Sequence, residues 1–265
     1  MSRFSETQSS IYGPVDSWRF GLSLGVDLIL QTSVCSFNCV YCQLGSIQKI
    51  TNKRQLFVKT EKIMSDLEKS DWQKSDIITF SGSGEPTLAT NLGETLKKIK
   101  HYTKIKTHVL TNGTLLQDKS VRSELCNADR VSVKLDAVDE KMFASVNRPF
   151  GGITLESILK GTKIFRNQFS GFFDTQIMFL PANKKMTGKL CDLINEIRPD
   201  EVQLNTPKRA YPSSWFIESR GRYDYEKSKT KLHKLKVIEM KDAIEIENEI
   251  RKKTGVIVSS VYGES

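Results

Sequence analysis

Three cysteines lie within eight residues, at Cys35, Cys39 and Cys42, and this spacing constrains the chain more than any other feature. Thiolates so close in sequence can converge on one metal centre. A structural zinc site would need a fourth protein ligand, and all three histidines of the chain lie far from this loop. A simple electron-transfer cluster would also need a fourth close ligand. A four-iron cluster on three thiolates leaves one iron open to a small molecule, so the loop favours a cluster that acts on a bound cofactor.

Segments that favour strands alternate six times with segments that favour helices. The predicted strands cover residues 24–32, 77–80, 106–110, 130–136, 172–180 and 201–205. The predicted helices cover residues 60–70, 91–102, 140–146, 155–167, 188–197 and a segment that reaches residue 126. This alternation predicts an α/β fold with a parallel sheet and right-handed crossovers, two units short of a closed TIM barrel. Residues 1–20 are expected to form a loosely structured lead-in.

A glycine-rich turn follows the second predicted strand, in the run Ser81-Gly82-Ser83-Gly84-Glu85-Pro86-Thr87. Parallel α/β folds place their sites at the carboxyl ends of strands, so we expect this turn beside the cysteine loop, which follows the first strand. Glycines let the backbone approach a ligand closely, and the amides and carbonyls of this turn, with Glu85 nearby, could hold an amino group. The alternative is an ordinary strand-to-helix turn with a proline near the helix start.

The fourth predicted strand alternates apolar residues, beginning at Val131, with Ser132, Lys134 and Asp136. Helices cover the outer face of such a sheet, so the apolar set is expected outside and the polar set inside. A buried lysine and aspartate need partners. They either pair with each other or bind a ligand.

The same alternation applies to the last two predicted strands. Gln176, Gln203 and Asn205 are expected to face inward, toward a substrate or a cofactor. Asn112, at the end of the third strand, is a further candidate for the same pocket.

The cysteine spacing, with Tyr41 just before the third cysteine, resembles the cluster loop of the radical S-adenosylmethionine enzymes. The runs Gly21–Asp27 and Gln43–Gly45 narrow the resemblance to the subfamily related to the wyosine-type tRNA-modifying synthases. Ser83-Gly84-Glu85 is similar to the Gly-Gly-Glu motif that binds the methionyl amine, with a serine in place of the first glycine. Residues 202–206, followed by Lys208 and Arg209, resemble the sixth-strand signature of that subfamily.

The resemblance, which extends from about residue 12 to 212, implies an open partial (β/α)6 TIM-like barrel. It implies a [4Fe-4S] cluster on the three cysteines and bound S-adenosylmethionine, whose reductive cleavage gives a 5′-deoxyadenosyl radical that abstracts hydrogen from an unidentified substrate. The residues implied for the cofactor are Tyr41, Gly82, Ser83, Gly84, Glu85, Asn112, Ser132, Lys134 and Asp136. Gln176, Gln203, Asn205 and Arg209 are expected toward the substrate. An electron donor such as flavodoxin or ferredoxin is implied as a partner. Trp18 and Phe150 depart from the family pattern, where relatives often carry a basic residue and a histidine.

The net charge of +9 and the pI of about 9.2 favour a polyanionic partner, with tRNA as a candidate substrate, or else reflect a solvated basic surface. The chain lacks a second cluster loop, so wyosine formation itself is not expected. Two alternatives stay open: a radical activase or maturase of a protein partner, and a non-catalytic iron–sulfur protein that binds RNA.

Cys126 and Cys191 are expected to be buried, inert thiols rather than a disulfide framework. No apolar run is long enough to span a membrane, and no signal peptide is evident, so a cytoplasmic protein without a membrane partner is expected. The pattern changes after Pro212, which divides the chain into a barrel domain of residues 1–212 and a C-terminal extension of residues 213–265 packed on the barrel. In that extension the sequence predicts a long helix over residues 229–253, ended by Gly255, and an edge strand at residues 256–258.

Overall fold

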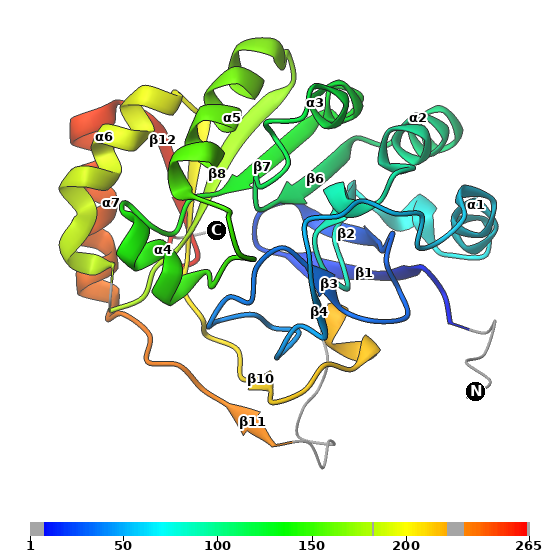
Figure 1. The fold of residues 1–265 in the computed structure, drawn as a ribbon, viewed down its shortest axis with the longest axis horizontal. Coiled ribbons are helices and arrows are strands. Elements are labelled where there is room, and N and C mark those ends of the chain that lie inside the picture. The colour runs from blue at the N-terminus through cyan, green and yellow to red at the C-terminus, as the bar shows by residue number, and fades with distance from the viewer. Residues whose placement is uncertain (1–7, 182, 222–230, 264–265) are drawn as a thin grey trace.

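The computed structural model of the 265-residue chain describes residues 8–181, 183–221 and 231–263. Within these residues an eight-stranded sheet has the order β1-β2-β5-β6-β7-β8-β9-β12. Its neighbouring strands are parallel, except for antiparallel β1 and β2. The strands are β1 (Ile11–Ser17), β2 (Gly21–Val26), β5 (Ile77–Phe80), β6 (Thr107–Thr111), β7 (Arg130–Lys134), β8 (Phe172–Met178), β9 (Glu201–Asn205) and β12 (Ile257–Ser260). Figure 1 shows the sheet curled into part of a barrel.

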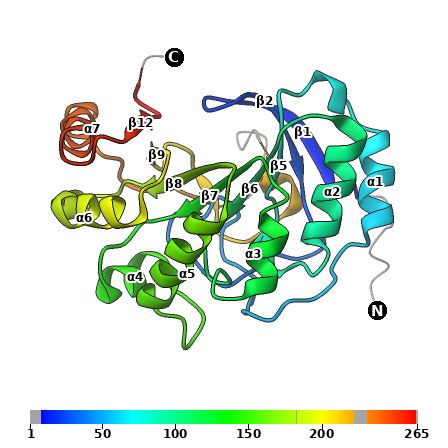
Figure 2. The same ribbon diagram turned by 90° about the horizontal axis from the view of Figure 1, so that it is seen from above.

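Helices lie along the outer side of the sheet (Figures 1 and 2). They are α1 (Thr60–Glu68), α2 (Leu92–Thr103), α3 (Lys119–Leu125), α5 (Leu155–Gln168), α6 (Thr187–Ile197) and α7 (Met240–Thr254). A further helix, α4 (Glu140–Val146), lies near the cysteine loop, residues 35–42. Helix starts are fixed by side-chain caps where the sequence offers them: Asp118, Asp139 and Thr154 accept hydrogen bonds from amides in the first turns of α3, α4 and α5.

Short elements complete the described structure. Two small pairs of strands join β3 (Val34–Cys35) to β4 (Lys49–Ile50) and β10 (Tyr211–Pro212) to β11 (Leu232–His233). The 3-10 helices are η1 (Trp72–Lys74), η2 (Pro86–Leu88), η3 (Lys184–Met186) and η4 (Ile217–Arg220). None of the helices in the described part of the chain has the length and apolar character needed to cross a membrane.

The outer face of the sheet is apolar and packs against the helices. Val131, Phe173 and Val202 are fully buried in one hydrophobic cluster with Leu96 of α2 and Ile194 of α6. Burial of each such side chain stabilises the fold by about 1.5–3 kcal/mol.

The inner face is polar, as the alternation of residues predicted. Hydrogen-bonded pairs join neighbouring strands: Ser23 with Thr79 at 2.8 Å, His108 with Ser132 at 2.7 Å, and Gln176 with Gln203 at 3.0 Å. Buried polar groups satisfy one another here without filling the concave side with apolar side chains.

The predicted α/β partial barrel is confirmed, and each of the six predicted strands is present. Two expectations near the N-terminus were wrong. Residues 11–17 of the supposed lead-in form β1, whose register shifts between Tyr12 and Val15, so the alternation that would reveal a strand is broken. The first predicted strand, which is β2, ends at Val26 rather than at residue 32, because the Asp27 carboxylate accepts hydrogen bonds from the amides of Ile29 and Leu30 and so turns the chain. Residues 1–7 lie outside the described structure.

The C-terminal segment also differs from its prediction. The long helix predicted over residues 229–253 begins only at Met240, after β11; residues 229 and 230 lie outside the described structure. Gly255 ends the helix in the left-handed conformation, at φ 69°, as predicted. The predicted edge strand is β12, which pairs in parallel with β9. Cys191 is buried, but Cys126 is exposed because it lies just beyond the end of α3.

Candidate functional site

The cysteine loop is held between the ends of the parallel strands and α4. Val34 bridges to Gly84, just beyond β5, while the Val40 amide donates to the Val146 carbonyl at 2.9 Å. Phe37 is buried edge-on against Phe143 of α4, with ring centroids 5.3 Å apart. Backbone bonds on two sides and one aromatic anchor therefore fix the path of the loop.

The three cysteines are free and half-buried, and amide donors reach two of them. Asn112 Nδ2 lies 3.6 Å from Cys35 Sγ, and Asn147 Nδ2 lies 3.5 Å from Cys39 Sγ. Burial raises the pKa of all three thiols, that of Cys39 to about 12. Such thiols stay protonated until a bound cation displaces the proton, and nearby N–H donors then stabilise the sulfur charge.

This donor set fits an iron–sulfur cluster. Among the residues that the structure describes, no three His, Cys, Asp or Glu side chains converge closely enough to hold a single metal ion. The cysteines of a cluster bind different irons, so they do not have to converge on one point.

The glycine turn lies directly against the cysteine loop. Gly82 and Gly84 have φ values of 140° and 153°, which side chains rarely adopt. A Cβ on Gly84 would lie 1.7 Å from the Val34 carbonyl oxygen. Glycine is therefore required here for the two motifs to touch, as their positions at strand ends predicted.

The Glu85 carboxylate is buried and already bonded within the protein. Its oxygens accept hydrogen bonds from Thr87 Oγ1 at 2.6 Å, Thr87 N at 3.1 Å, Thr111 Oγ1 at 2.7 Å and Asn112 N at 2.8 Å. Burial raises the pKa of this carboxyl, against hydrogen bonds that favour the ion. Glu85 thus joins the ends of β5 and β6, and a contact of its carboxylate with an amino group stays a prediction.

Asp136 is the hub of a network at the end of β7. Its carboxylate accepts hydrogen bonds from the Tyr41 hydroxyl, from Asn147 Nδ2 at 2.9 Å and from the Met178 amide at 2.7 Å. Lys134 Nζ lies 3.3 Å from the same carboxylate and 5.1 Å from the centre of the Tyr41 ring. Lys134 and Asp136 therefore form the ion pair that the sequence left open as an alternative to cofactor binding. Their role toward a cofactor stays a prediction, as does that of Ser132, which is bonded to His108.

A third buried carboxylate, that of Asp27, joins the glycine turn to η4. Asp27 accepts hydrogen bonds from Ser83 Oγ of the glycine turn at 2.7 Å and from Arg220 Nη1 of η4 at 2.9 Å. Both Asp27 and Arg220 have almost no exposed side-chain surface, at 1% and 9%. This ion pair fixes the glycine turn against the C-terminal segment.

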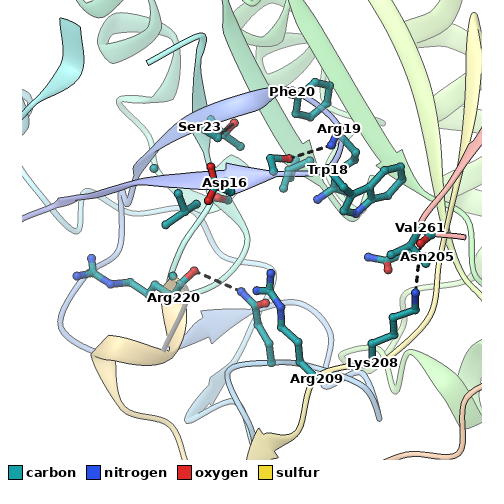
Figure 3. A pocket seen from close by; sticks show the side chains of 18 of the residues that line it. Asp16, Trp18, Arg19, Phe20, Ser23, Asn205, Lys208, Arg209, Arg220 and Val261 are labelled. Carbon is teal, nitrogen blue, oxygen red and sulfur yellow. Dashed lines mark hydrogen bonds between the residues drawn. The ribbon is translucent and has the colours of Figure 1, made fainter. Parts of the chain in front are cut away.

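A cavity of about 310 Å³ opens on the inner side of the sheet, between the β1–β2 hairpin and the segment after β9 (Figure 3). Its lining includes Trp18, Arg19 and Phe20 of the hairpin, His108 of β6, Asn205, Lys208 and Arg209, Arg220, and Tyr41 of the cysteine loop. Tyr41 therefore belongs both to the Asp136 network and to the cavity wall. Burial, helped by the nearby cations Arg130 and Arg209, lowers the pKa of the Arg19 guanidinium to about 10, although the Asp174 carboxylate acts in the opposite direction.

The residues predicted toward the substrate separate into two groups. Asn205 and Arg209 line the cavity. Gln176 and Gln203 are buried and bond each other at 3.0 Å; neither is among the lining residues. Trp18, noted for its departure from the family pattern, lies at the cavity wall.

Sequence reasoning missed Asp27, Arg19, His108 and Arg220. Arg19 was hidden by the expected lead-in, and Arg220 meets Asp27 across 193 residues of sequence, which no local pattern reveals. Asp27 stands in the Gly21–Asp27 run, so its position was a signal for a site residue. His108 alternates with outward-facing Val109, which the strand pattern could have shown.

Comparisons with known proteins agree with this geometry. A family model described as the Radical SAM superfamily matches residues 29–194. The UPF0026 protein slr1464 of Synechocystis sp. is 48% identical over 218 residues, 82% of each chain. A probable GTP 3′,8-cyclase of Saccharolobus islandicus is 26% identical over 191 residues, 70% of this chain and 58% of the relative.

Solved structures share the fold. Streptococcus suis SuiB bound to S-adenosylmethionine matches 88% of this chain with a TM-score of 0.60 at 15% identity. Native anSMEcpe with bound AdoMet also matches 88%, with a TM-score of 0.59 at 18% identity. The chain spans 49% and 62% of the lengths of those two proteins.

Proposed function

The chain belongs to the Radical SAM superfamily, and from that premise we propose that it generates a radical from S-adenosylmethionine beside the cysteine loop and uses it on a substrate held in the cavity. Membership of the family implies its two cofactors, a [4Fe-4S] cluster and S-adenosylmethionine. When bound, these cofactors supply a 5′-deoxyadenosyl radical by one-electron cleavage of the sulfonium, and the radical abstracts a hydrogen atom from the substrate.

One observation carries the proposal. Val34, which directly precedes the cysteine loop, bridges to Gly84 of the glycine turn, and Tyr41 of the loop lines the cavity. The three cysteines, the glycine turn and a cavity of ligand size are thus continuous in one part of the molecule.

The protein residues would hold the reactants and exclude water. Cys35, Cys39 and Cys42 would bind the cluster, with Asn112 and Asn147 as donors to sulfur. The backbone of the glycine turn would receive the amino group of S-adenosylmethionine, because the Glu85 oxygens are engaged elsewhere.

Lys134 and Asp136 position Tyr41 between the cofactor and the cavity, through the Asp136 bond to the Tyr41 hydroxyl. Ser132 would support them from the inner face of β7. Fixed side chains of this kind align a substrate for reaction.

The narrower parts of the proposal rest on the sequence. They are a kinship with wyosine-type tRNA-modifying synthases, tRNA as a substrate, and a flavodoxin or ferredoxin as electron donor in a reducing cytoplasm. In the described residues several lysines of the basic surface are already paired: Lys98 with Glu94, Lys100 with Asp129 and Lys184 with Asp242. This pairing reduces the charge available to a polyanion. An activase of a protein partner would place its substrate in the same cavity, and a non-catalytic RNA-binding protein would not consume S-adenosylmethionine.

The experiment is to measure 5′-deoxyadenosine formed by anaerobic, cluster-loaded protein with a strong reductant and S-adenosylmethionine. We expect slow formation without substrate and none from Cys39→Ala, which lacks a cluster ligand. Cys126→Ala removes an exposed cysteine away from the loop and should react like the wild type. Equal rates for Cys39→Ala and Cys126→Ala would show that the cysteine assignment is wrong.

A further inference from the structure

We propose that the cavity binds a nucleotide moiety, with its planar base against Trp18 and its phosphate between Arg19 and Arg209. The inference rests on the proposed function and deepens it by naming the substrate class. It is carried by the charge, the unmet hydrogen bonds and the aromatic wall of the cavity.

The charged residues on the cavity wall are four cations and one acid: Arg19, Lys208, Arg209 and Arg220 against Asp16. The positive charge of Arg220 is balanced by its ion pair with Asp27. Within the described residues Arg209 has neither a hydrogen bond nor an ion pair, and Lys208 donates to the Val261 carbonyl, at 3.2 Å. The remaining excess of positive charge favours an anion in the cavity.

Two buried polar atoms on the wall have no hydrogen-bond partner among the described residues. They are Arg19 Nε and His108 Nδ1. His108 is fully buried and its Nε2 bonds Ser132, while its Nδ1 is left without a partner among the described residues. Unpaired buried polar atoms are uncommon in folded proteins and point to a missing partner. Burial also lowers the pKa of His108, so the ring is neutral, with one nitrogen that donates a hydrogen bond and one that accepts a hydrogen bond.

The wall beside these atoms is aromatic. Arg19 lies over the Trp18 ring, 5.2 Å from its centre, and Phe20 lies edge-on to His108 at 4.8 Å. Trp18 is 40% exposed, so part of its ring surface is accessible to a ligand. Figure 3 shows Trp18 and Arg19 on one side of the cavity and Lys208 and Arg209 on the other. Flat rings stack on such a wall, and arginine forks match phosphate oxygens.

The size of the cavity selects one nucleotide rather than a folded peptide. A volume of about 310 Å³ is at the lower end of ligand pockets. A free nucleotide and a single residue of an RNA chain share this chemistry.

Binding would be measured by calorimetry on the full-length, cluster-loaded protein with saturating S-adenosylmethionine, so that the cofactor site is filled. The probes are AMP and GMP, their nucleosides adenosine and guanosine, and a short single-stranded RNA. We expect the monophosphates to bind at least about tenfold more tightly than the nucleosides, since each charge-assisted bond to phosphate contributes roughly ten- to a hundredfold.

Two variants measure the contributions of the phosphate and of the base to binding separately. Arg209→Gln should lower the affinity for AMP and GMP by about tenfold and leave the affinity for the nucleosides unchanged. Trp18→Leu should lower the affinity for both kinds of probe by about tenfold. Lys97→Gln removes one charge from the exposed side of α2, away from the cavity, and is the matched control. Equal affinity for nucleotide and nucleoside, or equal effects of Arg209→Gln and Lys97→Gln, would overturn the proposal.

The RNA probe identifies the source of the nucleotide. RNA that binds more tightly than GMP, with the same dependence on Arg209, assigns the site to an RNA residue; weaker RNA binding assigns it to a free nucleotide. The same preparation is assayed for 5′-deoxyadenosine. Cleavage of S-adenosylmethionine without nucleotide binding would refute only this inference. Nucleotide binding without cleavage of S-adenosylmethionine would refute the proposed function.

Discussion

Replacing Asp136 by asparagine tests how the end of β7 is held together. The carboxylate accepts hydrogen bonds from the Tyr41 hydroxyl, Asn147 Nδ2 and the Met178 amide. It also forms an ion pair with Lys134 at 3.3 Å. Asparagine keeps the shape but removes the charge and turns one acceptor into a donor. At least one N–H or O–H donor then faces another donor, and Lys134 loses its counterion.

The expected cost follows from burial. Removing one partner of a buried ion pair costs about 3–5 kcal/mol, and we expect the lower end because the Lys134 side chain is 23% exposed. For a protein of this size, about 3 kcal/mol lowers the melting temperature by about 6–12 °C. The matched control is Asp71→Asn, whose ion pair with Lys74 is largely exposed and is worth less than about 1 kcal/mol.

Calorimetry of both variants, with and without S-adenosylmethionine, checks this reasoning. We expect Asp136→Asn to melt well below Asp71→Asn, while S-adenosylmethionine raises both midpoints equally. An Asp136→Asn protein with the same melting temperature as the wild type would refute the structural role of Asp136. If it also gained no stability from S-adenosylmethionine, the carboxylate would belong to the cofactor site instead.

Three further predictions follow from buried contacts. Gly84→Ala should lose iron, measured by metal analysis, because its Cβ would overlap the Val34 carbonyl, whereas Gly188→Ala meets no atom within 4 Å and should retain the wild-type iron content. Arg220→Leu leaves Asp27 buried without its cation and should cost about 3 kcal/mol in chemical denaturation; an unchanged midpoint would contradict this. Burial raises the pKa of Asp174 from 3.8 to about 6, so the folded state binds a proton that the unfolded state releases between those values. The buried charge of Asp174 therefore destabilises the fold fully above about pH 6, and this destabilisation disappears as the pH falls to about 4. Over that fall in pH, the free energy of unfolding of the wild type should rise by up to about 3 kcal/mol relative to that of Asp174→Asn. A difference between the two proteins that does not change with pH would refute this prediction.

The order of elements could be predicted because each parallel strand has a local signature. The predicted bounds of β5 and β9 match the structure, since the apolar run of β5 and the alternating polar and apolar residues of β9 are each closed by turn residues at both ends. The orientation of Ser132 also followed from alternation within β7. Local pattern therefore gave the sheet and the place of both motifs.

Contacts between distant segments could not be predicted in the same way. The Asp27–Arg220 pair, the Tyr41 bond to Asp136 and the β12 pairing with β9 join residues that no local pattern relates. The sequence also could not show that the Glu85 oxygens are engaged within the protein. Partner choice inside a folded chain depends on packing, which alternation and spacing do not encode.

The most direct test of the account is the electron paramagnetic resonance spectrum of the reduced protein, prepared without oxygen. Three cysteines at Cys35, Cys39 and Cys42 would leave one iron of a four-iron cluster open to S-adenosylmethionine. The account predicts about one such cluster per chain and a reduced signal that changes when S-adenosylmethionine is added. Stoichiometric zinc without iron, or a cluster signal that S-adenosylmethionine leaves unchanged, would contradict it.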